Sequence, residues 1–468
     1  MDPWWRSLWR HLSSNSLCDW VGRGMILLVI YAVPLMALTT PRVEVSDAFE
    51  WSDAAKLLML AMIASSSGLY VVMRWYENPR WVGEFWAFGF TALAVWGLAT
   101  VLWSALPSVT IDKAGQFGLM CVYASAIGRL VRTRRAIDDL LRHLTMAMLV
   151  MCGAIILCYV IDPEASGLDR VRIHTGGDGL VHPTAAGSTA SLGILVVLLS
   201  HRLFGCRWAI RYAPAVGVLF GLTLLLSNSR MSLAMLLVVG GPMLWRMTTW
   251  TMWATIAVLG SAASMMVFLT DPGFVGIGSG LDGVSEYLMR GQDTRQLSAA
   301  SGRVEMWTAI WNSYLNSPIV GHGWFVTSQD GNLYVWFEHA NHLSHNIVLQ
   351  VLSTTGLVGL AIFGTSILTM IAAIVRRYVG DQGDASVSSA TARFAAFLLP
   401  WYAGWSLFSS SFVGPTRPET MIWFTMVGLL IAGKGVTEPI ETGPIETDPI
   451  EMPGDSVDIE ASSILSHY

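Results

Sequence analysis

Long apolar stretches separated by short polar segments dominate the chain. A membrane-spanning helix needs about 20 mostly apolar residues, and the pattern predicts twelve such spans. They lie near residues 22–40, 54–73, 84–106, 114–130, 140–161, 183–200, 209–227, 230–246, 250–270, 346–375, 392–412 and 417–433. Only the polar tetrapeptide Ser227-Asn228-Ser229-Arg230 divides the apolar run 209–246, which is far too long for one crossing, so a tight reversal is expected there. The predicted fold class is therefore an all-α integral membrane protein.

Composition supports this class and excludes a soluble globular domain. Hydrophobic residues make up 53% of the chain and charged residues 13%, whereas a soluble domain carries about 25% charged residues. The apolar stretch after the N-terminal segment continues without a small-residue cleavage site, so no cleavable signal peptide is expected. The five cysteines show no metal-binding spacing and are expected to be small membrane-helix residues.

Lysine and arginine in short loops orient the predicted spans, because these residues favour the cytoplasmic side. If the N-terminus lies inside, the cytoplasmic segments carry Arg6, Arg10, Arg23, Arg74, Arg80, Arg132, Arg134, Arg135, Arg202, Arg207, Arg211, Arg246, Arg376 and Arg377. The outer loops carry fewer, namely Arg42, Lys113, Arg170, Arg172, Arg230 and Arg417. The pattern predicts that both termini are cytoplasmic.

The same pattern divides the chain into five parts. Residues 1–21 form a cytoplasmic segment, 22–270 hold spans one to nine, 271–345 form one large outer loop with short amphipathic helices, and 346–433 hold the last three spans. Residues 434–468 carry an acidic repeat of the type Glu-Pro-Ile-Glu-Thr and are expected to be a disordered cytoplasmic tail. The tail is either a solvated end or a docking segment.

Unusual polar residues gather on the predicted outer side. Arg230 lies at the mouth of a helical hairpin, where it either snorkels to lipid headgroups or binds an anion. Residues 303–316 have apolar positions at three- and four-residue spacing, which predicts an amphipathic helix that caps the bundle or lies on the membrane. Arg303 in its first turn opposes the helix dipole, so it is expected to hold an anion there, with a surface salt bridge as the alternative.

Three of the ten histidines fall between residues 339 and 345, directly before the tenth span. Zinc binding is disfavoured because the spacing is irregular and Glu338 is the only nearby carboxylate. A general base at the helix N-terminus is favoured, because the helix dipole there disfavours the imidazolium. Ser344 or Asn346 is expected to cap that helix, and the cap and the base are compatible.

Together these residues suit glycosyl transfer from a lipid-linked pyrophosphate to a hydroxyl acceptor. Arginines would stabilise the leaving diphosphate, and the histidine would take the proton of the hydroxyl. The outer face shows no clustered carboxylates, so the sequence does not require a divalent metal.

Several segments resemble the signature of the O-antigen ligase and polymerase superfamily. These are the Ser227–Arg230 turn, Ser301-Gly302-Arg303, Gly321-His322-Gly323-Trp324, Ser344-His345-Asn346 and Gly356-Leu-Val-Gly359. The resemblance covers about residues 180–375 and implies a metal-independent, inverting glycosyltransferase of the bacterial inner membrane with a periplasmic active site and no cofactor. Its donor would be an undecaprenyl-pyrophosphate-linked glycan.

The resemblance also assigns roles to residues. The catalytic histidine carries over onto His345, with His342 as a second candidate, and the pyrophosphate-binding arginines carry over onto Arg230 and Arg303. Ser344 and Asn346 would support the histidine. Arg170, Arg172, His182 and Arg417 also face outward in the predicted topology but match no family motif.

Three acceptors fit this chemistry: another lipid-linked repeat unit, the lipid A core, or a protein hydroxyl. A polymerase of an exopolysaccharide or O-antigen is favoured over a ligase or a protein glycosylating enzyme. Expected partners are the lipid bilayer, a chain-length regulator or other polysaccharide assembly proteins, and no nucleic acid. A transporter or lipid-linked sugar flippase is the rival class, but the two halves show no repeat and the spans carry few charges.

Overall fold

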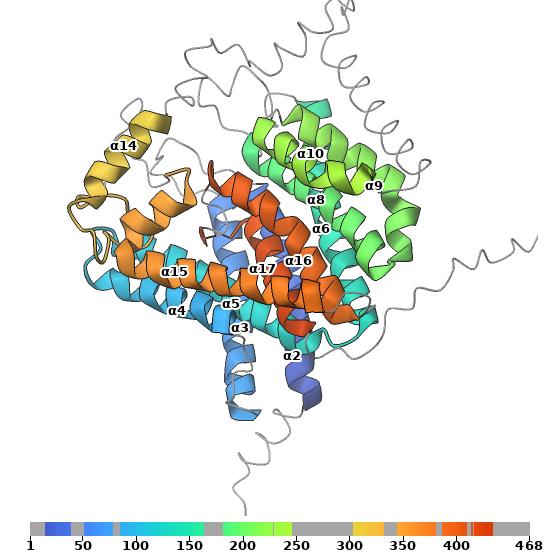
Figure 1. The fold of residues 1–468 in the computed structure, drawn as a ribbon, viewed down its shortest axis with the longest axis horizontal. Helices are drawn as coiled ribbons and strands as arrows, with labels where there is room; N and C mark the ends of the chain where they lie inside the picture. The colour runs from blue at the N-terminus through green and yellow to red at the C-terminus, as the bar shows by residue number, and fades with distance from the viewer. Residues whose placement is uncertain are drawn as a thin grey trace, which may run out of the picture.

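The computed structural model describes residues 15–38, 51–77, 85–162, 181–227, 229–245, 303–331, 344–380, 386–409, 413–414 and 416–433. Within these residues the chain is helical (Figure 1). The helices are α2 (Asn15–Ala37), α3 (Trp51–Glu77), α4 (Phe85–Ala99), the 3-10 turn η1 (Thr100–Leu102), α5 (Pro107–Leu130), α6 (Arg134–Ile161), α8 (Pro183–Phe204), α9 (Arg207–Leu226), α10 (Arg230–Trp245), α14 (Arg303–Tyr314), α15 (Ile347–Gly380), α16 (Val387–Ser406) and α17 (Pro418–Ala432).

A helix lies on every predicted span except that at 250–270, which falls outside the described residues. Six of the described helices, α2, α3, α6, α8, α9 and α15, are long and apolar enough to cross a membrane, and α4, α10 and α17 include shorter apolar segments. The protein is therefore an all-helical, multi-pass membrane protein. The total of twelve spans and the large outer loop remain predictions.

Two predicted boundaries near the start of the bundle are wrong. The third span was expected to continue to residue 106, but α4 ends at Ala99 and η1 follows it. The fourth was expected to begin at residue 114, but Pro107 at the first helical position starts α5 there, where proline is well tolerated. Asp112 and Lys113 consequently lie within α5 and not in a loop, because the helix begins at Pro107, ahead of the apolar run.

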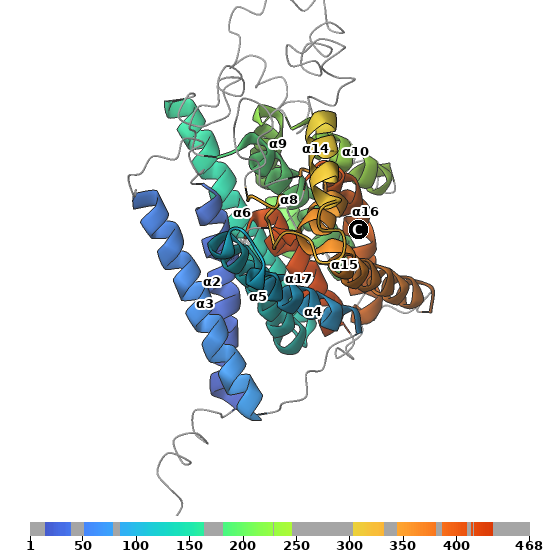
Figure 2. The same ribbon diagram turned by 90° about the vertical axis from the view of Figure 1, so that its left-hand side faces the viewer.

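The helix α17 forms the centre of the bundle. Nearly all of its residues are buried, and it packs mainly on α5, with further contacts to α16, α8 and α2. Its aromatic residues Trp423 and Phe424 contact Phe90 of α4 and Tyr402 of α16. The pair α2 and α3 lies at the edge of the bundle (Figure 2).

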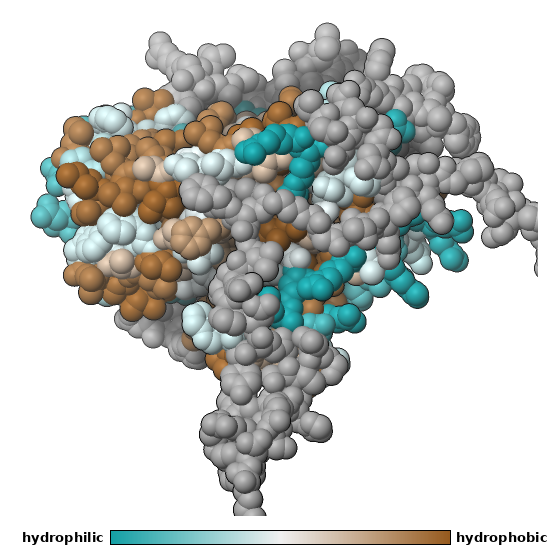
Figure 3. Space-filling view, turned by 60° about the horizontal axis from the view of Figure 1, so that its bottom comes forward, coloured by the Kyte–Doolittle hydropathy of each residue, from teal (hydrophilic) through white to brown (hydrophobic). Residues whose placement is uncertain are grey.

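Apolar side chains cover much of the outside as well. Leu58 and Val72 of α3 and Leu368 of α15 are more than half exposed. Figure 3 shows broad hydrophobic areas on one part of the surface and hydrophilic residues gathered on another. Such an apolar exterior is expected where lipid, and not water, surrounds the helices.

Basic residues meet at one end of the bundle. Arg129 at the end of α5 pairs with Asp19 of α2 at 3.6 Å. Arg134 at the start of α6 donates to the Phe204 carbonyl at the end of α8, and Arg377 donates to the Leu430 carbonyl of α17. The positive-inside rule assigns this end to the cytoplasm, and that assignment stays a prediction.

The helix α15 is broken at Gly356, whose φ of 67° and ψ of −168° are not helical. Residues 318–323 fill the break: His322 N–H and Gly323 N–H donate to the carbonyls of Ser353 and Thr354, and Leu357 N–H donates to the Pro318 carbonyl. The sequence predicted one continuous span from 346 to 375. The structure instead has a short first half, which carries the histidine end, joined to a longer helix that continues to Gly380.

The amphipathic helix predicted at 303–316 is present as α14, which ends at Tyr314 before the turn at residues 315–320. Its buried face is made by Met306, Ile310 and Tyr314. Val304 and Trp311, which were expected on the same apolar face, are about half exposed at 50% and 46%. The apolar positions therefore divide between a buried face and an exposed face.

Candidate functional site

Asn346 caps the short first half of α15. Its side-chain oxygen accepts hydrogen bonds from the backbone N–H groups of Val348 at 3.0 Å and Leu349 at 3.1 Å. Because these N–H groups have no partner within the helix, an asparagine at this position fixes where the helix begins. Of the two predicted caps, Asn346 is the one that forms.

Ser344, the residue before His345, is also held by hydrogen bonds. Its hydroxyl donates to the Asn346 carbonyl at 2.6 Å, and its backbone N–H donates to the side chain of Gln350 at 2.7 Å. Ser344 and Gln350 are both buried. The residues before and after His345 are therefore held by hydrogen bonds to each other as well as to further partners.

His345 itself adopts a left-handed backbone conformation, with φ of 49°. For a residue with a side chain, such a conformation costs about 1–3 kcal/mol and persists only where the surroundings impose it. The bonds of Ser344 and Asn346 impose it here. The half-buried His345 side chain therefore leaves the backbone in a fixed direction at a helix N-terminus. Backbone strain of this kind concentrates at functional sites.

The helix α14 contacts this segment through Trp307, whose indole N–H donates to the Ser344 carbonyl at 2.9 Å. Arg303 is the first residue of α14, one turn before Trp307. One helical turn advances about 5.4 Å along the axis, so the backbone of Arg303 begins α14 close to the His345 segment. The Arg303 side chain lies outside the described part of the structure.

Arg230 is the first residue of α10 and is half-buried. The preceding helix α9 ends at Leu226, which confirms the predicted tight reversal. Ser227 and Ser229 in this turn lie against Gly187 of α8, where an added Cβ would approach the Ser229 Cβ to 2.4 Å. The Ser229 and Ser232 hydroxyls are 2.7 Å apart. Close packing of small polar residues therefore fixes the start of α10.

The last turns of α16 connect the start of α15, which carries His345, with the start of α10, which carries Arg230. The Asn346 side-chain amide donates to the Leu407 carbonyl just after α16 at 3.4 Å. The Trp401 indole N–H donates to Ser191 of α8 at 2.9 Å, and Ser191 in turn donates to the Ser232 carbonyl of α10 at 3.0 Å. The structure thus places His345, the start of α14 and Arg230 at the end of the bundle opposite the basic end.

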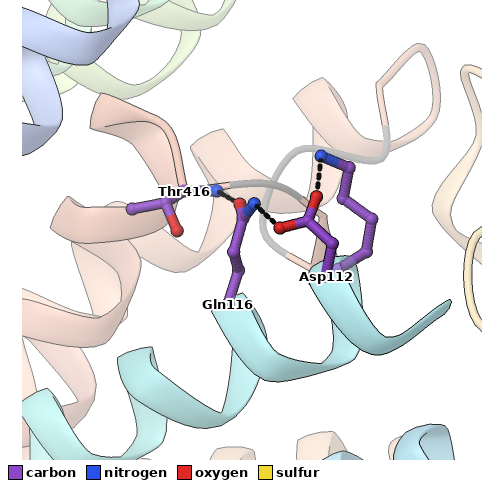
Figure 4. Close-up of polar contacts among 4 residues, drawn as sticks. Asp112, Gln116 and Thr416 are labelled. Atoms are coloured by element: carbon purple, nitrogen blue, oxygen red, sulfur yellow. Dashed lines mark hydrogen bonds and ion pairs between the residues drawn. The ribbon is translucent and has the colours of Figure 1, made fainter. Parts of the chain in front are cut away.

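Sequence reasoning missed a polar network at this end (Figure 4). Asp112 of α5 accepts from Lys113 at 2.7 Å and from the Gln116 amide at 2.8 Å, and the Gln116 carbonyl oxygen accepts from the Thr416 backbone N–H at 2.7 Å. The network fastens the segment before α17, including Arg417 at its N-cap, to α5. The polar residues that interrupt an otherwise apolar helix at 112–116 were the available signal.

Some of the other candidate residues lie within the described structure, and others lie outside it. His342, Arg170 and Arg172 lie outside the described residues. His182 is the N-cap of α8, where its side chain accepts from the Thr184 backbone N–H at 3.3 Å. His322, within the Gly321–Trp324 motif, is buried, and its ring bonds to the Ser313 carbonyl at 2.9 Å. These contacts explain His182 and His322 as structural residues.

One family model, described as "O-Antigen ligase", matches residues 215–364. The matched region includes most of α9, all of α10 and α14, and the short first half of α15, so Arg230, Arg303 and His345 all lie within it. No curated protein matches the chain.

Proposed function

Since residues 215–364 carry the O-antigen ligase domain of the O-antigen ligase and polymerase superfamily, we propose that the protein polymerises lipid-linked glycan repeat units at the outer face of the bacterial inner membrane. The donor in this proposal is a glycan on undecaprenyl pyrophosphate, and the acceptor is a sugar hydroxyl of a second lipid-linked unit. The family match and the apolar helices support a membrane protein of glycan ligase or polymerase type.

In the proposed reaction the acceptor hydroxyl oxygen attacks the anomeric carbon of the donor sugar. A new glycosidic bond forms as the bond from that carbon to the diphosphate oxygen breaks, which inverts the anomeric configuration. His345 takes the hydroxyl proton as general base. Arg230 and Arg303 bind the leaving diphosphate, whose developing charge they stabilise without a required metal ion.

The observation that carries this proposal is the conformation of His345. A histidine held at φ 49° between two anchored residues, next to the first turns of α14, has a fixed side-chain direction. A general base must lie within hydrogen-bond reach of the proton that it removes. Fixing the backbone on both sides of the ring provides that precision, whereas a structural histidine needs no such strain.

The direct test is His345→Ala in the full chain, compared with His143→Ala. His143 lies on α6 and bonds to Tyr31, outside the matched domain. We expect His345→Ala to lose product by roughly 100-fold or more, in keeping with the size of general-base catalysis, while His143→Ala retains it. Both variants must insert and elute as the wild type does. Normal product from His345→Ala would refute the general-base role.

The arginines are tested by conservative replacement. Arg230→Lys and Arg303→Lys keep the charge but lose the planar, bidentate guanidinium. We expect each to lower turnover by about tenfold or more, because a charge-assisted bidentate contact is replaced by a point charge. Full activity in both lysine variants would mean that only charge, and not phosphate geometry, matters.

Reconstitution separates the acceptor classes. The purified protein is given an undecaprenyl pyrophosphate-linked repeat unit, with and without EDTA, and the products are separated on a gel. A ladder of lengths without added core, unchanged by EDTA, supports a metal-independent polymerase. Product that requires lipid A core or a protein acceptor would instead identify a ligase or a protein glycosylating enzyme. The absence of transfer with every acceptor would favour the transporter class.

A further inference from the structure

Exposed apolar side chains surround the break in α15. Leu357 directly follows the break and is 51% exposed. Ile319 is 63% exposed, and its backbone carbonyl accepts a hydrogen bond from the Val358 N–H at 3.2 Å. Leu315, four residues before Ile319, is 56% exposed. Because backbone hydrogen bonds join the segment before Gly321 to the residues after the break, these side chains belong to one surface.

The ends of α4 and α14 extend this surface. Trp103 follows η1, and its indole N–H donates to the Gly321 carbonyl at 3.2 Å, which holds the ring beside the break. Its neighbour Leu102 is 86% exposed. The Trp311 carbonyl in the last turn of α14 accepts from the Leu315 N–H at 3.2 Å. We call the following six residues the outer apolar patch: Leu102, Trp103, Trp311, Leu315, Ile319 and Leu357.

The length of α15 places the patch at a membrane surface. Leu357 lies 19 residues before Arg376, which is exposed at the basic end of the bundle. At about 1.5 Å per residue this separation is about 29 Å along the helix, and the hydrocarbon core of a bilayer is about 30 Å thick. With Arg376 at one membrane surface, Leu357 therefore lies at the opposite edge of the hydrocarbon. A tilt of α15 would place Leu357 deeper in the lipid, not farther out.

The helix α4 leads to the same depth. Gly89 packs against Ser366 of α15, and the Trp96 indole N–H donates to the Thr355 carbonyl at 3.1 Å, so α4 runs antiparallel to α15. Its last turn, η1, therefore lies level with the break. The sequence from residue 85 to residue 111 contains no charged side chain. Nothing in this stretch opposes contact with lipid.

The charges of α14 lie at its other end. Arg303 and Glu305 are in the first turn, and residues 306–329 contain no lysine, arginine, aspartate or glutamate. Tryptophan is enriched where the hydrocarbon meets the headgroups, and a contiguous exposed apolar surface marks a contact with a membrane or another protein. Figure 3 shows a broad hydrophobic area on the side of the molecule where α4 lies in Figure 1.

We propose that the outer apolar patch is inserted into the outer leaflet, at the boundary between acyl chains and headgroups, and that α14 enters the lipid with its C-terminal end. The partner is the phospholipid bilayer itself. Trp307, one turn before Trp311, bonds the Ser344 carbonyl, so the insertion fixes the height of the His345 segment above the hydrocarbon. The competing occupants are a second copy of the protein and another segment of this chain.

Photo-crosslinking identifies what covers the patch without relying on turnover. Benzoylphenylalanine replaces Leu315 or Ile319 in the full chain, which is purified into nanodiscs of radiolabelled phospholipid. Leu368, 68% exposed within α15, is the positive control, and the exposed polar residue Gln329 is the negative control. We expect lipid adducts at positions 315, 319 and 368 and none at 329. A crosslink between two copies, a crosslink within the chain, or no adduct at 315 and 319 while 368 reacts would overturn the proposal.

The effect on the site is tested with charge substitutions, and this arm rests on the proposed function. Trp311→Glu and Leu315→Glu are compared with Gln329→Glu, which adds the same charge at an exposed polar position. We expect the first two to raise KM for an undecaprenyl-linked donor in bilayers by about tenfold, because the charge draws α14 out of the lipid. Turnover of a water-soluble donor with a short prenyl chain should not change, and Gln329→Glu should leave both reactions unchanged.

The two arms fail in distinguishable ways. An unchanged KM for the undecaprenyl-linked donor, or equal losses with both donors, would overturn the role of the patch in setting the height of the site. The absence of transfer by the wild type with every donor would overturn the proposed function alone. The lipid adducts at positions 315 and 319 would then still decide whether the patch lies in the membrane.

Discussion

Replacing Gly356 by alanine tests whether the break in α15 is a required part of the fold. Gly356 has φ of 67° and ψ of −168°, a combination that is essentially restricted to glycine. A Cβ built at this position would approach the Ile319 carbonyl oxygen to 2.1 Å and the Val320 nitrogen to 2.4 Å. Both are backbone atoms that cannot rotate away, so the alanine forces residues 318–323 off the break.

The cost has two parts. The backbone conformation alone costs about 1–3 kcal/mol for a residue with a side chain. Displacing residues 318–323 also strains or breaks the hydrogen bonds at the break, such as Leu357 N–H to Pro318 at 2.9 Å, each worth about 1 kcal/mol. We therefore expect Gly356→Ala to destabilise the protein by roughly 3 kcal/mol or more.

Gly364→Ala in the same helix is the matched control. A Cβ there meets no atom within 4 Å, and alanine is favoured over glycine in a helix interior by about 0.5–1 kcal/mol. Thermal unfolding of both variants in one detergent should show a lower Tm for Gly356→Ala and an unchanged or higher Tm for Gly364→Ala. Equal Tm values would refute the argument that the break is rigid.

Further predictions concern the cap of α15 and the cysteines. Asn346→Ala removes the N-cap bonds and the bond to Leu407, so it should destabilise the protein by about 1 kcal/mol and lower kcat more than KM. Asn346→Asp keeps the cap acceptor and should recover most of the Tm. Equal Tm values for the two variants would contradict the cap. Burial raises the pKa of the Cys206 thiol, and its hydrogen bond with Asp138 adds to this. Because the thiolate is the reactive form, maleimide should label Cys206 slowly in the folded protein at pH 8 and faster as the pH rises. Rapid labelling in SDS is the control. Fast labelling of Cys206 in the folded protein would contradict the burial.

Hydropathy locates the described helices because lipid imposes one rule on every span: apolar side chains and a closed set of backbone hydrogen bonds. Hydropathy misplaces a helix boundary where a buried polar residue finds its hydrogen-bond partners inside the bundle. Gln116 is buried because Asp112 and Thr416 take up its amide, so α5 begins well before the apolar run does. No pattern in residues 107–113 alone carries that information, since the partner Thr416 is far away in the sequence.

The break in α15 was missed for a related reason. Glycine is common within membrane helices, so Gly356 alone does not predict an interruption, and the residues that follow it are apolar. What decides the conformation is the segment 318–323, which offers backbone partners to both halves of the helix. The candidate residues Arg230 and Arg303 were easier to find, because a charge at the start of an apolar helix stands out in the sequence alone.

The break also explains how one residue can be held precisely at a membrane surface. A continuous α15 would tie the direction of His345 to the tilt of a long helix that lipid surrounds. The short first half is instead fixed by its own neighbours: Gln350 bonds the Ser344 backbone, Trp307 bonds its carbonyl, and residues 318–323 hold the other end. The first half of α15 is therefore positioned by α14 and by residues 318–323, and not by the long second half of α15. The position of the histidine should then depend on Trp307 and Gly356 more than on substitutions in the second half of α15.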